Sequence, residues 1–276
     1  GSGGLARRKQ LELLLVGGEG ALHIAEGALR KHLGMPDVQQ LTMVGRITGT
    51  GAGTLTGSNN ASTWGLDGTP TYTDAAGVAN FSGFAALQGG SAIDTFNVAA
   101  ASTFNIAGGD GVDVLALGGN TLTGSFAGGL AGGTITGIGS AVLTAAGATG
   151  FNGTSANVSL GFTDVATLAG TGTLTGLNTA STWGLDGTPT YTDTVSTNVL
   201  NFSGFATLQG GSAIDTVNVT AASTFNLLGG LGVAVLNISA ALTGSVNGEG
   251  AGGTLQGTQI TNVAITGPSA TIGVTG

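Results

Sequence analysis

The chain contains the same passage twice, and this duplication constrains its fold more than any other feature. The passage ASTWGLDGTPTYTD occupies residues 61–74 and again residues 180–193, an offset of 119 positions. A second pair follows, FSGFAALQGGSAIDTFNV at 81–98 and FSGFATLQGGSAIDTVNV at 202–219. The offset is 121 there, because the second copy has two extra residues before this passage. Self-similarity at a fixed period is typical of a modular or repeat architecture.

The duplication divides the chain into two repeats of about 120 residues, 45–163 and 164–276, preceded by a segment of residues 1–44. Within that segment, residues 5–34 have Leu and Ala near helical spacing, which favours a helix. The glycines of LLLVGGEGALHIAEGAL also suit two strands joined by a turn, so both interpretations stay open. We expect residues 1–44 to cap the repeats or to dock on another subunit.

Short strands are the expected element of both repeats. Glycine supplies 55 of the 276 residues and charged residues only 7%, against usual shares of roughly 7% and 25%. Runs such as TFNV at 95–98 and VLAL at 114–117 alternate apolar and small polar residues between clusters of Gly, Asn and Asp. Aromatic residues are only 5%, which suits a thin aliphatic core better than a sandwich or barrel. We therefore predict an all-β chain that winds as a parallel β-solenoid (β-helix), with about 20 residues per coil.

Charge is distributed very unevenly. All six basic residues lie within the first 46 positions, and the chain after Arg46 contains ten acidic residues and no Lys or Arg. A body without cations cannot neutralise phosphates, so nucleic acid is excluded as its partner. The chain has no cysteine and therefore no disulfide or thiolate-metal framework. It also has no apolar run of about 18 residues, so we expect no transmembrane helix.

A glycine–aspartate turn in the first repeat suggests a calcium site. Residues 108–116, GGDGVDVLA, fit the nonapeptide G-G-x-G-x-D-x-U-x, whose turns bind Ca²⁺ in some repeat proteins. The interval from Asp94 to Asp113 is close to the length of two nonapeptides, which would place both residues at the same edge of successive coils. Carboxylate and carbonyl oxygens are the ligands that Ca²⁺ prefers. We therefore name Asp94, Asp110 and Asp113 as candidate calcium ligands, with a relict structural turn as the alternative.

The second repeat retains only part of this pattern. Asp215 matches Asp94, but Leu231 and Ala234 stand where the first repeat has Asp110 and Asp113. Calcium is therefore not required to build the second repeat.

Two other features have a structural and a binding interpretation. Trp64 and Tyr72, which recur as Trp183 and Tyr191, are expected in the core, with a carbohydrate-stacking platform as the alternative. Pairs of threonines separated by one residue recur along both repeats and suit the polar face of a sheet. An ice- or crystal-binding face is their alternative role, but the sequence intervals between the pairs are too irregular to predict one flat array.

The motifs resemble a β-strand repeat of very large bacterial surface and secreted proteins. That resemblance, to filamentous-haemagglutinin-like or RTX-type adhesins and S-layer-like proteins, covers about residues 45–276. It is carried by TLTG at 54–57, STWGLDG at 62–68, NFSGF at 80–84, LQGGSAIDTFNV at 87–98 and GGDGVDVL at 108–115. The resemblance implies an extracellular scaffold, adhesive stalk or fibre module at the cell surface.

The residues favour a structural role over an enzymatic one. The repeats lack the Arg or Lys of β-helical lyases, and their aspartates recur in both copies, which suits structure better than one active site. We predict no catalytic residues. Our functional prediction is a self-associating subunit of a bacterial surface fibre or layer, joined head to tail as a homo-oligomer or filament. The alternative is a monomeric stalk of a large adhesin that contacts host or surface glycans.

Overall fold

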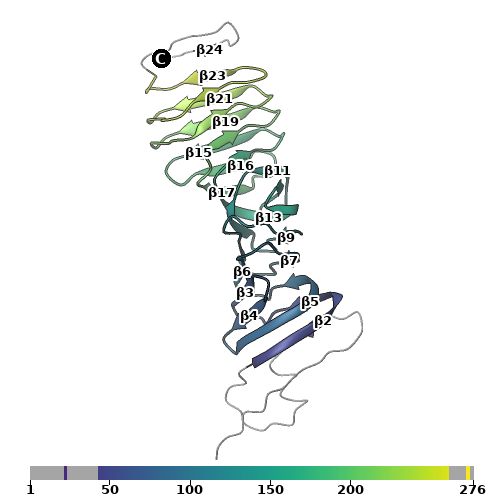
Figure 1. Cartoon of the computed structure of the whole chain (residues 1–276). Coiled ribbons are helices and arrows are strands. Elements are labelled where there is room, and N and C mark those ends of the chain that lie inside the picture. Colours follow the sequence, from purple (N-terminus) through teal and green to yellow (C-terminus); the bar gives the residue numbers. More distant parts are fainter. Residues whose placement is uncertain (1–21, 24–42, 261–271, 274–276) are drawn as a thin grey trace, which may run out of the picture.

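The computed structural model describes residues 22–23, 43–260 and 272–273 (Figure 1). Over these residues the protein is all-β, as predicted, and contains no helix. The strands join one mixed sheet in which most neighbours run parallel. The ribbon is elongated, and its strands lie across the long axis (Figure 1). In the part of the chain that is described, no helix has the length and apolar character needed to cross a membrane.

Alternation of inward and outward side chains explains why these short segments form strands. In β3 (Ser62–Leu66) and β6 (Asp94–Val98), every second residue is buried and the residues between are partly or fully exposed. Successive side chains of a strand point to opposite faces, so such a segment buries one face only. Thr, Val, Phe and Trp suit this surface because β-branched and aromatic side chains pack well on a pleated sheet.

Most of the parallel strand pairs belong to four ladders, and Met43–Thr48 pair in parallel with Gly77–Ser82 outside them. Ladder 1 contains the C-terminal halves of β2 (Met43–Thr56) and β5 (Gly77–Gln88), then β7 (Asn105–Ala107), β9 (Phe126–Ala127) and the first half of β13 (Val158–Gly170). Ladder 2 contains β3, β6, β8 (Val114–Ala116), β10 (Gly133–Ile138), the second half of β13 and β17 (Val199–Ser203). Ladder 3 contains β11 (Ala141–Ala146), β14 (Thr173–Thr175), β18 (Thr207–Gln209), β20 (Asn226–Leu228) and β22 (Val246–Asn247). Ladder 4 contains β15 (Ser181–Leu185), β19 (Asp215–Val219), β21 (Ala234–Ile238), β23 (Gly253–Gln256) and β24 (Ile272–Gly273).

Neighbours within a ladder are separated along the chain by a short interval or by a long one. The short interval occurs where the chain returns directly, as it does from Thr95 to its neighbour Val114. The long interval occurs where a hairpin is inserted, as it is between Trp64 and its neighbour Phe96. The inserted hairpins contribute the antiparallel strands β4 (Thr71–Asp74), β12 (Phe151–Ser155) and β16 (Thr190–Asp193). The interval of about 20 residues expected from the sequence therefore occurs only where no hairpin is inserted.

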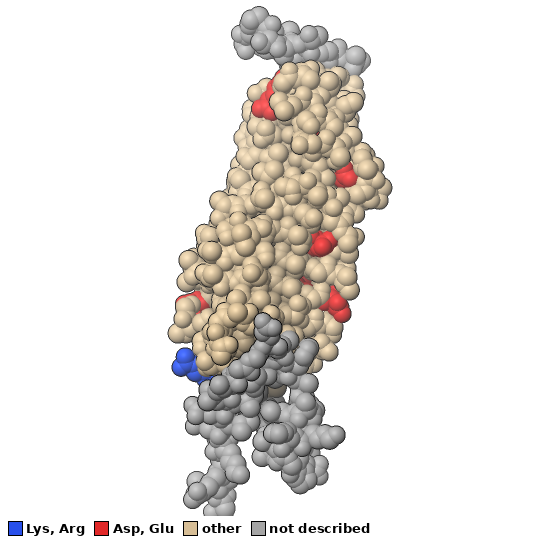
Figure 2. Space-filling model, turned by 90° about the vertical axis from the view of Figure 1, so that its right-hand side faces the viewer, with Lys and Arg blue, Asp and Glu red and all other residues tan. Residues whose placement is uncertain are grey.

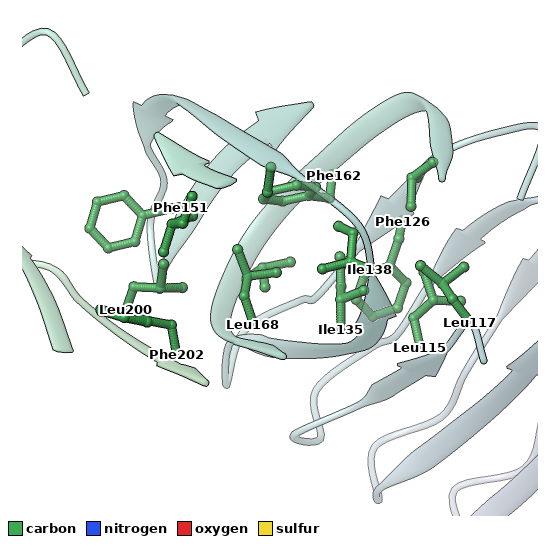
Figure 3. Packing of buried hydrophobic residues seen from close by; sticks show 14 of the residues in the cluster. Leu115, Leu117, Phe126, Ile135, Ile138, Phe151, Phe162, Leu168, Leu200 and Phe202 are labelled. Carbon is green, nitrogen blue, oxygen red and sulfur yellow. The ribbon is translucent and has the colours of Figure 1, made fainter. Parts of the chain in front are cut away.

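Inward side chains of all four ladders form one hydrophobic cluster. Figure 3 shows the part where the two repeats meet: Leu168 lies between Ile135 and Phe202, its neighbours in ladder 2. All three side chains are buried, and each such burial stabilises the fold by roughly 1.5–3 kcal/mol. Because β13 runs through the boundary at 163/164, the two sequence repeats share one core.

Four residues of the N-terminal segment are described, namely Leu22, His23 and the first two residues of β2, Met43 and Val44. Leu22–His23 form β1, which pairs in parallel with Leu55 and Thr56 of β2. These two residues are therefore strand, whereas the rest of 5–34, on which the helix prediction depends, lies outside the described residues. The division into 1–44, 45–163 and 164–276 remains a prediction about sequence units.

Close contact between successive turns explains the glycine pair in both LQGG passages. A Cβ atom on Gly90 would lie 1.9 Å from the carbonyl oxygen of Ser58. The equivalent atom on Gly211 would lie 1.8 Å from the carbonyl oxygen of Leu177. Glycine is required at these two positions because only a residue without a side chain allows the backbones to approach so closely.

Candidate functional site

Aspartates buried beside ladder 2 form the candidate site. Asp94 begins β6 and its side chain is fully buried. Its Oδ1 accepts a hydrogen bond from the Ser62 hydroxyl on the neighbouring strand β3, and its Oδ2 accepts one from the Gly90 amide at 2.7 Å. Burial raises the pKa of Asp94, and these hydrogen bonds oppose the increase. Both oxygens of this carboxylate therefore already have partners within the protein.

Asp113 precedes β8 and is also fully buried. Its Oδ1 accepts a hydrogen bond from the backbone amide of Asp94 at 2.7 Å, which places the two residues one above the other. Its Oδ2 is buried and has no hydrogen-bond partner among the residues described. Burial raises the pKa of Asp113 to about 6, and the negative charges of Asp94 and Asp110 add to the increase. Asp110 is exposed, three positions earlier in the turn.

The three candidate ligands do not form a cation shell as they are placed. Within the described ranges, no group of three or more His, Cys, Asp or Glu side chains comes together as a metal site would require. Calcium takes six to eight oxygen ligands, whereas this turn offers one buried oxygen without a partner. The residues present do not fit the ion, and calcium binding remains a sequence prediction. A calorimetric titration tests it, because no heat at about millimolar calcium would remove the site.

The second repeat has the same arrangement with one aspartate fewer. Asp215 is buried and accepts hydrogen bonds from the Ser181 hydroxyl at 2.5 Å and the Gly211 amide at 2.7 Å. Its pKa is raised by burial. Ala234 occupies the position of Asp113 and is also buried. The shared part of the arrangement, a serine and an aspartate on neighbouring strands, therefore holds the turns of both repeats.

Ser62 and Ser181, the partners of these aspartates, were not predicted from the sequence. A signal was present, because Ser62, Trp64 and Leu66 occupy alternate positions of one strand and therefore share a face. All three side chains are buried. By the same alternation, Asp94 and Phe96 share the inward face of β6.

The repeated aromatic residues form a core cluster, as predicted. Trp64, Tyr72, Trp183 and Tyr191 are each at most 1% exposed, so none presents a stacking platform to solvent. Trp64 and Tyr72 meet edge to face with ring centroids 4.7 Å apart, and the second pair repeats this at 4.6 Å. Burial raises the pKa of Tyr191 to about 12. These residues stabilise each repeat from within.

Threonines of ladder 2 lie beside each other at two places. In ladder 2 Thr63 lies beside Thr95, and Thr134 lies beside Thr167, all on the outward side of the strands. Val114 lies between these two pairs in the same ladder, so they do not form an unbroken row of threonines. The side chains lie on the outward face of the sheet, and a bound ligand is not needed to explain them.

A shallow groove of about 190 Å³ lies in the second repeat, and its lining includes Asn178, Gln209, Glu249 and the backbone of Gly211 and Gly230. The Glu249 carboxylate accepts a hydrogen bond from the Gly230 amide at 3.0 Å, so it holds a turn of the chain. Hydrolysis of a glycoside uses a pair of carboxylates, and Glu249 is the single carboxylate in the lining of this groove.

Most of the visible surface is uncharged. Figure 2 shows acidic side chains as separate points on a surface of other residues. Arg46 is the one Lys or Arg within the described ranges. This face therefore offers neither a basic stripe nor a clustered acidic patch.

Scans against protein-family models, curated proteins and solved structures find no match to this chain. The resemblance to bacterial surface repeats therefore remains a prediction from the motifs.

Proposed function

We propose that residues 43–260 wind as a parallel β-solenoid and serve as a stiff structural module of an extracellular bacterial surface fibre or layer. The observation that carries this proposal is the stacking of parallel strands along the described body. One turn of a coil produces ladder neighbours at the short interval, such as Thr95 with Val114 and Thr207 with Asn226. The inserted hairpins lengthen single coils without breaking the ladders.

The chemistry of the body supports a scaffold role. Its core is filled by aliphatic and aromatic side chains, and its candidate aspartates are used to hold turns. Stacked coils resist bending because each strand is hydrogen-bonded to the coils above and below it. A module of this kind is long and stiff, which suits a fibre, layer or stalk.

Self-association is the second part of the proposal. The chain after Arg46 has ten acidic residues and no Lys or Arg, whereas residues 1–44 hold five basic and four acidic residues. This complementarity favours a contact between residues 1–44 of one copy and the acidic body of the next. A contact of this head-to-tail kind does not close on itself and produces a filament.

Sedimentation and electron microscopy of three proteins test the proposal. The intact chain should form filaments or layers, and deletion of residues 1–44 should leave single rods. A control that replaces Arg7, Arg8 and Lys9 with Gln keeps the length and should weaken assembly, with a steep dependence on salt. Filaments of unchanged form after the deletion would overturn the docking role. Single rods from the intact chain would favour the monomeric adhesin stalk instead.

A further inference from the structure

The ladders of the two repeats correspond to each other in sequence. Residues 207–209 of ladder 3 match residues 86–88 of ladder 1, because both lie in the duplicated FSGF passage. In the same way, Trp183 of ladder 4 matches Trp64 of ladder 2. A second repeat stacked straight on the first would therefore continue ladder 1 as ladder 3 and ladder 2 as ladder 4.

The observed register differs from straight stacking. Ladder 1 continues from Phe126 to Phe162, while ladder 3 already begins at Ala141. Both ladders are therefore present over the same length of chain and occupy different faces. Ladder 2 continues from Leu168 to Phe202, which matches Phe81 in the N-terminal half of β5, a strand half outside ladder 2.

We infer that the second repeat is turned by one face of the coil about the long axis, so that identical surfaces of the two repeats point in different directions. The inference rests on the proposed coil. A contact at the junction accompanies the longer loop of the second repeat. Asn198 lies in that longer loop, and its Nδ2 donates hydrogen bonds to the carbonyl oxygens of Gly147 at 2.9 Å and Gly150 at 2.8 Å. The first repeat has Gly77 at the matching position, so the contact belongs to the junction alone.

The rotation of the second repeat would affect how copies of the chain assemble. The hairpin tips at 67–69 and 186–188 have the same sequence and are exposed in both repeats. If copies of the chain associate through equivalent surfaces, these contacts wind around the rod rather than line one side of it. Such contacts build a twisted bundle of rods, not a flat layer. This consequence depends on the proposed self-association, whereas the turn itself does not.

Disulfide trapping tests the turn without any assembly, because the chain has no native cysteine. The register places Thr134 beside Thr167, whereas straight stacking would place it beside Thr182, the match of Thr63. Neighbouring strands lie about 4.8 Å apart, within the Cα range that a disulfide spans. Thr134→Cys with Thr167→Cys should form a disulfide under mild oxidation, and Thr134→Cys with Thr182→Cys should not. Thr63→Cys with Thr95→Cys is the positive control.

Intact-mass measurement after maleimide labelling reads the result. Formation of the Thr134–Thr182 disulfide without the Thr134–Thr167 disulfide would contradict the rotation of the second repeat. Should one variant fold poorly, Thr167→Cys with Asn201→Cys tests the same ladder independently. Electron micrographs of the unlabelled chain complete the test: twisted bundles support the consequence, and flat layers contradict it. Absence of any assembly would refute the proposed self-association, while the trapping result would still decide whether the second repeat is rotated.

Discussion

Truncating Leu168 to alanine tests whether the two repeats share one cooperative core. The side chain is 0% exposed and lies between Ile135 and Phe202 at the junction. Leu→Ala changes in cores cost about 2–5 kcal/mol, and the cost is higher where neighbours cannot collapse into the space. Strands hydrogen-bonded on both sides restrict such movement, so we expect a loss of about 3–4 kcal/mol. The control Leu160→Ala removes a side chain that is 72% exposed and should change stability by less than about 0.5 kcal/mol.

The two tryptophans allow each repeat to be followed separately. Trp64 and Trp183 are the two tryptophans of the chain, one in each repeat, and both are buried. Urea unfolding is measured by fluorescence in Trp64→Phe and in Trp183→Phe, each with and without Leu168→Ala. With a slope of about 2–3 kcal/mol per molar urea, the midpoint should fall by roughly 1–2 M for both reporters. Movement of one midpoint alone, or a shift no larger than that of Leu160→Ala, would refute the shared core.

Three further changes have definite expected results. The pKa of Asp113 is raised from 3.8 to about 6. The protonated carboxyl therefore stabilises the fold fully below pH 4, and this stabilisation is lost as the carboxyl ionises when the pH rises through 6. At pH 7.5, Asp113→Ala should stabilise the protein by roughly 1–2 kcal/mol, because removing the buried charge outweighs the loss of one hydrogen bond. At pH 3.5 the carboxyl is neutral, so the same change should destabilise the protein by about 1 kcal/mol through the lost hydrogen bond. Gly211→Ala should severely destabilise the fold because its Cβ would meet a backbone carbonyl, whereas Gly53→Ala meets only Phe84 at 3.8 Å and should be tolerated. Ser181→Ala should cost about 1–3 kcal/mol, because it leaves an oxygen of Asp215 buried without its donor.

Urea unfolding at matched pH checks all three. An Asp113→Ala effect of the same sign at both pH values would show that ionisation of this carboxylate does not control its contribution. Equal midpoints for Gly211→Ala and Gly53→Ala would contradict the close approach of the turns. A neutral Ser181→Ala would mean that the contact with Asp215 contributes little.

The repeat pattern predicted much of the fold because stacking depends on features that are visible in sequence. Alternation identified short strands, and the interval between Asp94 and Asp113 placed them on neighbouring turns. The same alternation also describes the antiparallel hairpin strands, such as β4, whose residues look like those of any half-buried strand. Sequence alone therefore did not separate parallel neighbours joined directly from those joined through an inserted hairpin.

The sequence predicted that Asp94 and Asp113 lie on neighbouring strands, but it did not predict which groups their carboxylates contact. The motif at 108–116 suggests calcium because its residue types match, yet the direction of each carboxylate depends on strand parity and on the donors of the adjacent turn. Asp94 faces inward and meets Ser62 and Gly90, and Asp113 meets the amide of Asp94. The turn of the second repeat about the axis was also hidden, because it results from pairings between residues far apart in the chain, such as Ile135 with Leu168.

A cryo-electron microscopy map that separates the strands would test the central claim most directly. Stacked parallel coils predict strands about 4.8 Å apart along the long axis of the particle, with the same chain direction in each ladder. Two facing antiparallel sheets about 10 Å apart, or a closed barrel, would contradict that account and the functions inferred from it.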